Sequence, residues 1–105
     1  MGASLATAGV ICAAAIAAAG LVGVGAAAAE SQRAAGVADA AALAAADTLA
    51  GFAAGDPCQR AGEVAAAQSA TVEKCVLDGL VATVAVRTSF GGIPVAAVAR
   101  AGPPL

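Results

Sequence analysis

The stretch that decides the fold is residues 2–54, with the sequence GASLATAGVICAAAIAAAGLVGVGAAAAESQRAAGVADAAALAAADTLAGFAA. Residues 1–29 carry no charged side chain, and this run exceeds the roughly 20 apolar residues needed to cross a bilayer. Alanine has the highest helix propensity, and no proline occurs before Pro57, so nothing interrupts a helix. We therefore expect a transmembrane helix over residues 1–29 that continues as an alanine-rich helical stalk over residues 30–54.

Two other interpretations of the N-terminal segment stay open. Ala27 and Ala29 form an A-x-A pattern, so cleavage after Ala29 would make residues 1–29 a signal peptide, although the usual positively charged start is missing. A soluble helix is the third interpretation, but a helix that is apolar on all sides must be covered on every side. The flanking charge does not give an orientation, because Arg33 is the only nearby cation.

Small residues recur along the apolar segment at close helical spacing. Such residues let the backbone of a second membrane helix approach closely, so they are candidate packing sites. The same spacing also arises by chance in any alanine- and glycine-rich helix. The candidate packing residues are Gly9, Ala13, Gly20 and Gly23.

The stalk shows no apolar stripe of large residues. Leu43, Leu49 and Phe52 do not fall on one helical face, so we predict no coiled-coil seam. Asp39 interrupts the alanine run and is a candidate partner contact, with simple solvation of the helix as the alternative. Gly51 is the first expected stop signal of the long helix.

Residues 55–105 predict a small α+β domain in which a short helix packs on an antiparallel hairpin or three-stranded sheet. Asp56 is a helix-capping residue and Pro57 suits the first helical position, so a helix should run to about Gln68. Asp78-Gly79 between two β-rich runs predicts a hairpin with a two-residue type I′ turn. That turn would place Leu77 opposite Leu80, and Cys75 opposite Ala82. The predicted inward face holds Cys75, Leu77, Leu80, Ala82, Val84 and Val86.

A loop over residues 91–94 should lead into a third strand over residues 95–101, ended by Pro103.

Cys58 and Cys75 are predicted to form a disulfide. Cys58 falls in the first turn of the short helix and Cys75 on the inward face of the hairpin, so a helix packed on that face brings them together. Such a bond requires an oxidising compartment and would place this domain outside the cytoplasm. Two unrelated buried thiols are the alternative. Cys12, inside the apolar segment, suits a small packing residue.

Composition argues against several classes of function. The chain has no histidine, five Lys or Arg residues that form no cluster, and scattered carboxylates. Histidine is the usual proton shuttle and the commonest metal ligand, and a row of cations is needed to bind phosphates. We therefore expect no enzymatic activity, no cofactor, no metal site and no nucleic-acid partner.

Three segments of the chain stand out together: Gly2-Ala3-Ser4-Leu5 before the apolar helix, the Arg33-Ala34-Ala35 and Ala38-Asp39-Ala40-Ala41-Ala42-Leu43 run, and Cys58 with Cys75 followed by Asp78-Gly79 and Arg100-Ala101-Gly102-Pro103. With these segments the chain resembles the small TadE-like proteins of actinobacteria encoded beside Flp-type pilus assembly genes, and more broadly the TadE/TadG-type pseudopilins. Near the start of the apolar helix, where pilin-like proteins carry a glutamate, Thr7 and its neighbours are uncharged.

The resemblance implies a membrane-anchored structural or accessory component, similar to a minor pseudopilin, of a Tad/Flp-type pilus or secretion system. Its partners would be the lipid bilayer, other pilin-like or secretion-system membrane subunits, and further copies of itself. The N-terminus would lie in the cytoplasm and the disulfide-linked domain outside the cell. The alternative function is a small secreted binding module, released by cleavage after Ala29.

Overall fold

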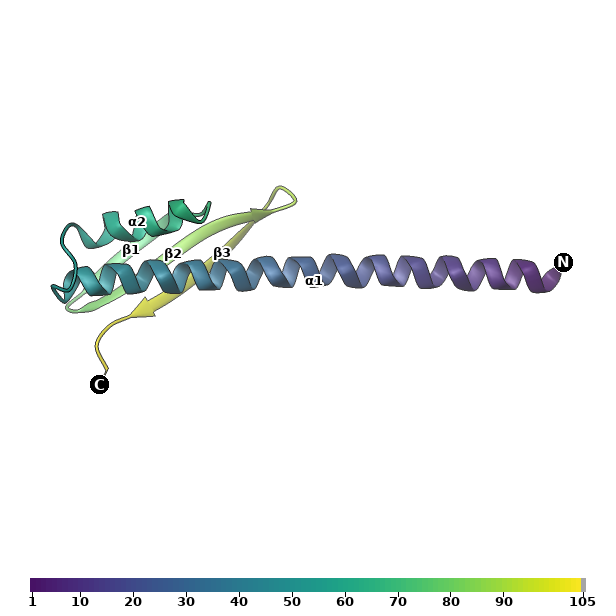
Figure 1. Ribbon diagram of the computed structural model, residues 1–105, viewed down its shortest axis with the longest axis horizontal. Coiled ribbons are helices and arrows are strands. Elements are labelled where there is room, and N and C mark those ends of the chain that lie inside the picture. Colours follow the sequence, from purple (N-terminus) through teal and green to yellow (C-terminus); the bar gives the residue numbers. More distant parts are fainter. Residues whose placement is uncertain (105) are drawn as a thin grey trace.

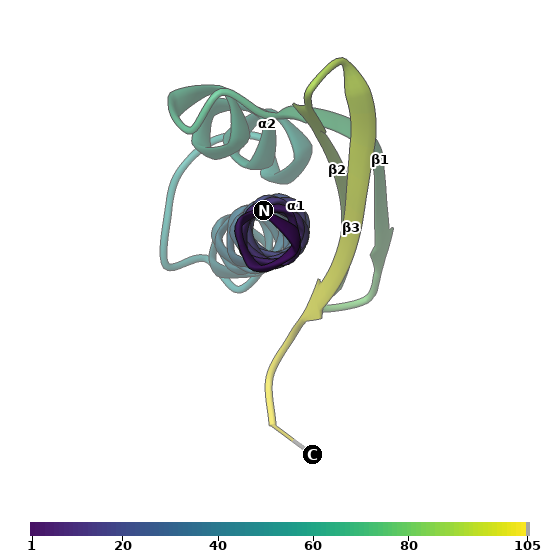
Figure 2. The ribbon, with the colours of Figure 1, turned by 90° about the vertical axis from the view of Figure 1, so that its right-hand side faces the viewer.

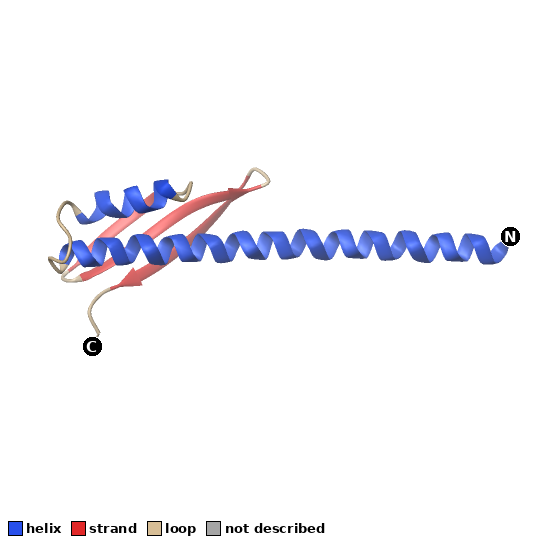
Figure 3. Ribbon diagram, viewed as in Figure 1, coloured by secondary structure: helices blue, strands red, loops and turns tan. Residues whose placement is uncertain are grey.

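The computed structural model describes residues 1–104, and Leu105, the last residue of the predicted C-terminal domain, lies outside them. Two helices are followed by three strands (Figures 1 and 3). The elements are α1 (Gly2–Leu49), α2 (Pro57–Ala67), β1 (Thr71–Asp78), β2 (Val81–Phe90) and β3 (Ile93–Ala101). The predicted α+β class, with a long N-terminal helix, a short helix and a three-stranded antiparallel sheet, is confirmed.

Helix α1 runs without interruption through the predicted apolar segment and most of the predicted stalk. It ends at Leu49, before the predicted end of the stalk at residue 54, because Gly51, the first expected stop signal, adopts a φ of +86° that an α-helix cannot continue. The Phe52 amide donates to the Asp47 carbonyl at 2.9 Å, and the Gly51 amide donates to the Thr48 carbonyl at 3.2 Å. These two bonds form a Schellman motif, which satisfies carbonyls that the helix end would otherwise leave unpaired.

Helix α2 begins as predicted. The Asp56 side chain accepts a hydrogen bond of 2.9 Å from the Gln59 amide, and Pro57 occupies the first turn. The capping bond satisfies one of the free amides at the helix start, while the missing proline N–H removes another.

The sheet is an antiparallel meander in the order β1-β2-β3, but its first turn differs from the prediction. Leu77 pairs with Ala82 and Cys75 with Val84, so the turn residues are Gly79 and Leu80 rather than Asp78 and Gly79. Gly79 has a φ of +60° and Leu80 has none of the positive φ that a type I′ turn needs, which is the type II′ pattern. Near this turn the pairing is shifted by two residues, so Cys75, Ala82 and Val84 keep their predicted face. Leu77, also predicted on the inward face, is 39% exposed at the end of β1. Leu80 lies in the turn.

The second turn is also tighter than predicted. Phe90 pairs with Ile93, which leaves only Gly91 and Gly92 between the strands, both with positive φ. This two-residue turn suits type I′ geometry and lets β3 begin at Ile93 instead of residue 95. Pro94 is tolerated because β3 is an edge strand.

The core lies around the C-terminal part of α1, which contacts both α2 and the sheet (Figure 2). From residue 34 onward its inward positions recur every three or four residues, as one broad helical face requires. The predicted stalk is therefore a central core helix, and the boundary proposed at residue 54 does not separate two packing units. The buried residues of this face are Ala34, Val37, Ala38, Ala41, Ala42, Ala45, Ala46 and Thr48.

Candidate membrane anchor and its junction with the folded domain

Residues 2–29 of α1 are exposed along their whole length. Figure 1 shows this part of the helix projecting beyond the sheet and α2. By length and composition the helix is suited to cross a membrane. Soluble monomeric proteins rarely expose an apolar surface of this extent, so the segment is a candidate site for contact with another apolar phase. The large apolar side chains on it are Leu5, Val10, Ile11, Ile16, Leu21, Val22 and Val24.

The four predicted packing residues of this segment lie on one side of the helix. At 100° per residue, Gly9, Ala13, Gly20 and Gly23 fall within about a quarter of the circumference. A Cβ atom built on any of the three glycines meets no atom within 4 Å. The chain itself therefore does not occupy this face, and the predicted helix packing stays a prediction.

The remaining predicted positions on α1 are also exposed. Asp39 points away from the core although it belongs to the folded half of the helix. Its predicted contact with a partner stays a prediction. Cys12 is an exposed free thiol in the apolar half of α1.

The predicted disulfide between Cys58 and Cys75 is present. Cys58 comes from the first turn of α2 and Cys75 from the middle of β1, with 5.9 Å between their Cα atoms. Both side chains are half-buried at the edge of the core. The bond joins the second helix to the sheet, and a loop of this length stabilises a fold by about 3 kcal/mol. It also indicates an oxidising environment for this part of the chain.

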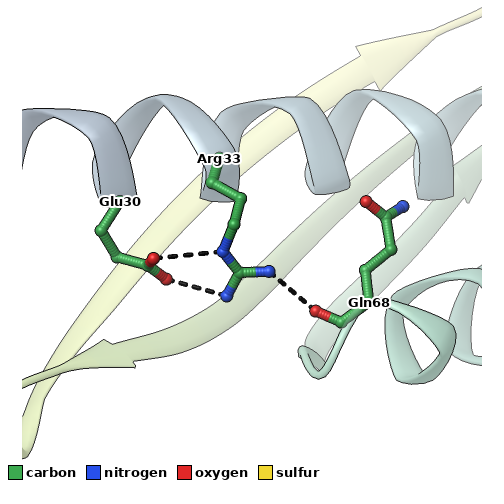
Figure 4. Close-up of polar contacts among 3 residues, drawn as sticks. All are labelled: Glu30, Arg33 and Gln68. Carbon is green, nitrogen blue, oxygen red and sulfur yellow. Dashed lines mark hydrogen bonds and ion pairs between the residues drawn. The ribbon is translucent and has the colours of Figure 1, made fainter.

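A polar junction, which sequence reasoning missed, ties the start of the folded half of α1 to the end of α2. Figure 4 shows Arg33 between Glu30 and Gln68. Its guanidinium donates to both carboxylate oxygens of Glu30, at 3.1 Å and 2.8 Å, and to the backbone carbonyl of Gln68 at 2.8 Å. The i,i+3 spacing of Glu30 and Arg33 is a local signal that could have predicted the ion pair, but no sequence signal points to Gln68, which is 35 residues away from Arg33.

The junction also contacts the sheet through Thr88 of β2. The paired Arg33 guanidinium lowers the pKa of Glu30 below its ordinary value, and the nearby Thr88 hydroxyl acts in the same direction. Thr88 is buried, and its Oγ1 makes no hydrogen bond of standard geometry to the residues that the structure describes. Glu30 is the first charged residue after the apolar segment. Along the axis of α1 it therefore lies at the same height as Thr88 of the sheet.

The geometry combines an exposed apolar helix with a rigid attachment to the folded domain. Within residues 1–104, no three His, Cys, Asp or Glu side chains come together at a potential metal site. What the arrangement offers is an exposed apolar helix, a polar junction at its base, and a small disulfide-linked domain built on the same helix. No family model, no curated protein and no solved structure matches this chain.

Proposed function

We propose that this chain is a single-pass membrane protein that serves as a structural component of a Tad/Flp-type pilus or secretion system, similar to a minor pseudopilin. Residues 1–29 span the membrane, the N-terminus lies in the cytoplasm, and the disulfide-linked domain lies outside. Its action is structural: the helix packs against other membrane helices, and the domain is displayed at the outer surface.

One observation carries the anchoring part of this proposal. Helix α1 passes from a segment that is exposed on every side into a segment that forms the centre of the core, without a break. A cleavable leader joined by a flexible linker would leave the domain free to move, whereas a continuous helix fixes the height and orientation of the domain relative to the bilayer. This rigidity suits a subunit that must hold a defined place in an assembly.

The disulfide supports the proposed topology. The Cys58–Cys75 bond is stable in oxidising compartments and is rare in the reducing cytoplasm. A single span then puts the N-terminus on the cytoplasmic side. The resemblance to TadE-like proteins supports the assignment to a pilus or secretion system, and the open face of Gly9, Ala13, Gly20 and Gly23 supports packing with a second membrane helix.

The alternative, a secreted module released after Ala29, is favoured by one feature. The first buried residue of the core is Ala34, so cleavage after Ala29 would leave every core residue in the product. The product would also keep Glu30 and Arg33, and with them the junction to α2. The mass of the mature protein separates the two functions, since only the anchored protein retains residues 1–29.

Topology is tested by labelling intact cells with a membrane-impermeant, mass-shifting maleimide, with and without an impermeant reductant, followed by fractionation. We expect the protein in the membrane fraction, with Cys58 and Cys75 labelled only after reduction. Labelling of both without reductant, and only after lysis, would place the domain in the cytoplasm and overturn the proposal. A Cys12→Ala variant removes the third thiol, so that every shift reports on the domain.

The assembly role is tested by deletion and complementation. We expect loss of the gene to reduce surface pili or secretion, and the wild-type chain to restore them. A Gly20→Leu/Gly23→Leu variant should reach the membrane but fail to restore function, because leucine blocks close helix approach. An Ala14→Leu/Ala15→Leu variant is the control, since these positions lie off the glycine face. Full function of the glycine variant would contradict helix packing through this face.

A further inference from the structure

The turn between β2 and β3 is apolar and free of charge. Residues 88–99 contain no charged side chain, and the nearest charges on these strands are Arg87 and Arg100. At the tip, Phe90 is 37% and Ile93 is 67% exposed. These two residues are direct cross-strand partners, so their side chains lie next to each other on one face of the hairpin. The tip therefore presents an exposed aromatic–aliphatic pair.

The tip lies on the side of the domain from which the apolar part of α1 projects. Figure 1 shows the β2–β3 turn as the part of the sheet nearest the N-terminal half of the helix. Thr88 is level with Glu30, where the charge-free segment of α1 ends. The strands continue beyond Thr88 for two residues before the turn, so Phe90 and Ile93 lie beyond this level.

Resting on the proposed membrane anchor, we propose that the β2–β3 tip is a second membrane contact, which enters the interfacial region of the outer leaflet beside the span. Phenylalanine and isoleucine favour this environment, and the tip carries no charge that must be dehydrated. The Gly91-Gly92 turn keeps the strands paired up to Phe90 and Ile93, so little unpaired backbone reaches the lipid. With two contacts, the domain is held against the membrane in one rotational orientation about α1.

The other turn of the sheet provides a matched comparison. Leu80 at the β1–β2 turn is 49% exposed, but it lies at the opposite end of β2 and follows the charged Asp78. Ten strand residues separate the two turns, which corresponds to about 30 Å. A turn at that distance from the bilayer should stay in water. Exposure of an apolar side chain at a turn does not by itself make a membrane contact.

The test uses an environment-sensitive fluorophore on single cysteines in the full-length protein, with Cys12→Ala and the disulfide intact. The protein is reconstituted in vesicles of phosphatidylcholine with a minority of phosphatidylglycerol, with or without lipid that carries a quencher near the headgroup. We expect a label at Ser89→Cys, which keeps Phe90 and Ile93, to emit to the blue and to be quenched several-fold more than a label at Leu80→Cys.

A pair of charge substitutions identifies the side chain responsible. Ile93→Asp should return the Ser89 label to water-like emission, whereas Val98→Asp should leave it unchanged, because Val98 is equally exposed at 68% but lies away from the tip. Amide hydrogen exchange of β2 confirms that both variants are folded. A label that stays buried in lipid after Ile93→Asp would overturn the role of the tip pair.

The outcomes also separate this proposal from the anchor on which it rests. A label on native Cys12 should be quenched by lipid quenchers placed deep in the bilayer. If the Cys12 label is quenched and the Ser89 label is not, the anchor stands and the tip contact is overturned. If neither is quenched, the anchor itself fails. Blue-shifted emission at Ser89 that disappears on dilution of the protein among vesicles, without lipid quenching, would assign the tip to a second copy instead.

Discussion

Residues 2–29 and residues 34–49 belong to the same helix and are both dominated by alanine, yet their surroundings are opposite. Every residue of the first segment is exposed, whereas Ala34, Ala38 and Ala41 of the second are fully buried. Composition and helix propensity therefore do not decide which half is covered. The difference arises because only the second half meets an opposing surface, which α2 and the sheet provide.

The buried half also shows how so small a core can be filled. The largest fully buried side chains of the core are three valines: Val37 on α1, and Val84 and Val86 on β2. With side chains this small, dense packing requires that the helix backbone approach its neighbours closely. A smooth alanine face permits that approach. The exposed half carries its leucines and isoleucines outward, where no such fit is needed within the chain.

The largest expected effect on this comparison comes from removing the covalent bond that holds α2 to the sheet. We expect Cys58→Ala/Cys75→Ala to lower the free energy of unfolding of the domain by about 3 kcal/mol, because the bond no longer restricts the unfolded chain. Hydrogen exchange of the β2 amides in increasing urea, on protein in detergent micelles, measures the change. Cys12→Ala in the exposed half should leave it unaltered. Equal stability of the double variant and wild type would contradict this role.

Introducing a larger side chain should lower the stability of the domain almost as much when the side chain is in the buried half of α1, and not at all when it is in the exposed half. Ala38 is fully buried, and a leucine there must push apart a close helix contact, so we expect Ala38→Leu to cost about 2–3 kcal/mol. The same exchange at Ala15, in the exposed half, should not change the stability of the domain. The urea dependence of β2 amide exchange again reports the difference. An unchanged Ala38→Leu protein would mean that this helix face is loosely packed.

Removing the two methyl groups of one valine in each half of α1 gives a third comparison. Val37 is 1% exposed and Val10 is 70% exposed. We expect Val37→Ala to lower the free energy of unfolding by about 2 kcal/mol, through lost burial and the cavity that remains. Val10→Ala should leave the domain unchanged and only weaken partitioning into membranes slightly. Destabilisation of the domain by Val10→Ala would show that the exposed half contributes to the core.

The smallest effect concerns the junction between the halves. Because Arg33 holds the pKa of Glu30 below its ordinary value in the folded state, the ionised carboxylate stabilises the fold. This contribution is present above the unfolded-state pKa of about 4.3 and is lost as the pH falls through the lowered folded-state pKa. We expect the stability difference between wild type and Glu30→Gln to shrink over that acidic interval. A difference that stays constant with pH would contradict the coupling.

Much of the fold could be predicted from the sequence where local chemistry was distinctive. Asp56 and Pro57 marked the start of α2, and the alternation of β1 and β2 placed Cys75 on the face that meets it. The register of the hairpin could not be predicted from that alternation. A shift of two residues leaves the same side chains on the same face, and Asp-Gly and Gly-Leu are both compatible with tight turns.

Burial of the stalk was missed for a different reason. The prediction searched for large apolar residues, and Leu43 and Phe52 turned out to be exposed. The usable signal was the run of small residues on the helical face opposite the exposed Asp39 and Asp47. In an alanine-rich helix this contrast is weak, because inward and outward positions carry the same side chain. The contact between Arg33 and Gln68 depended on tertiary packing and left no local trace.

The packing of β3 against α1 imposes an order on synthesis and folding. β3 is made after α1, α2 and the other two strands, and it lies against α1. A nascent chain that stops before Ile93 has no β3 to complete the surface around the alanine face of α1. The domain can therefore close only after β3 has emerged. Until then α1 must remain helical without the tertiary contacts of the domain. The high helix propensity of its many alanines favours the helix at this stage.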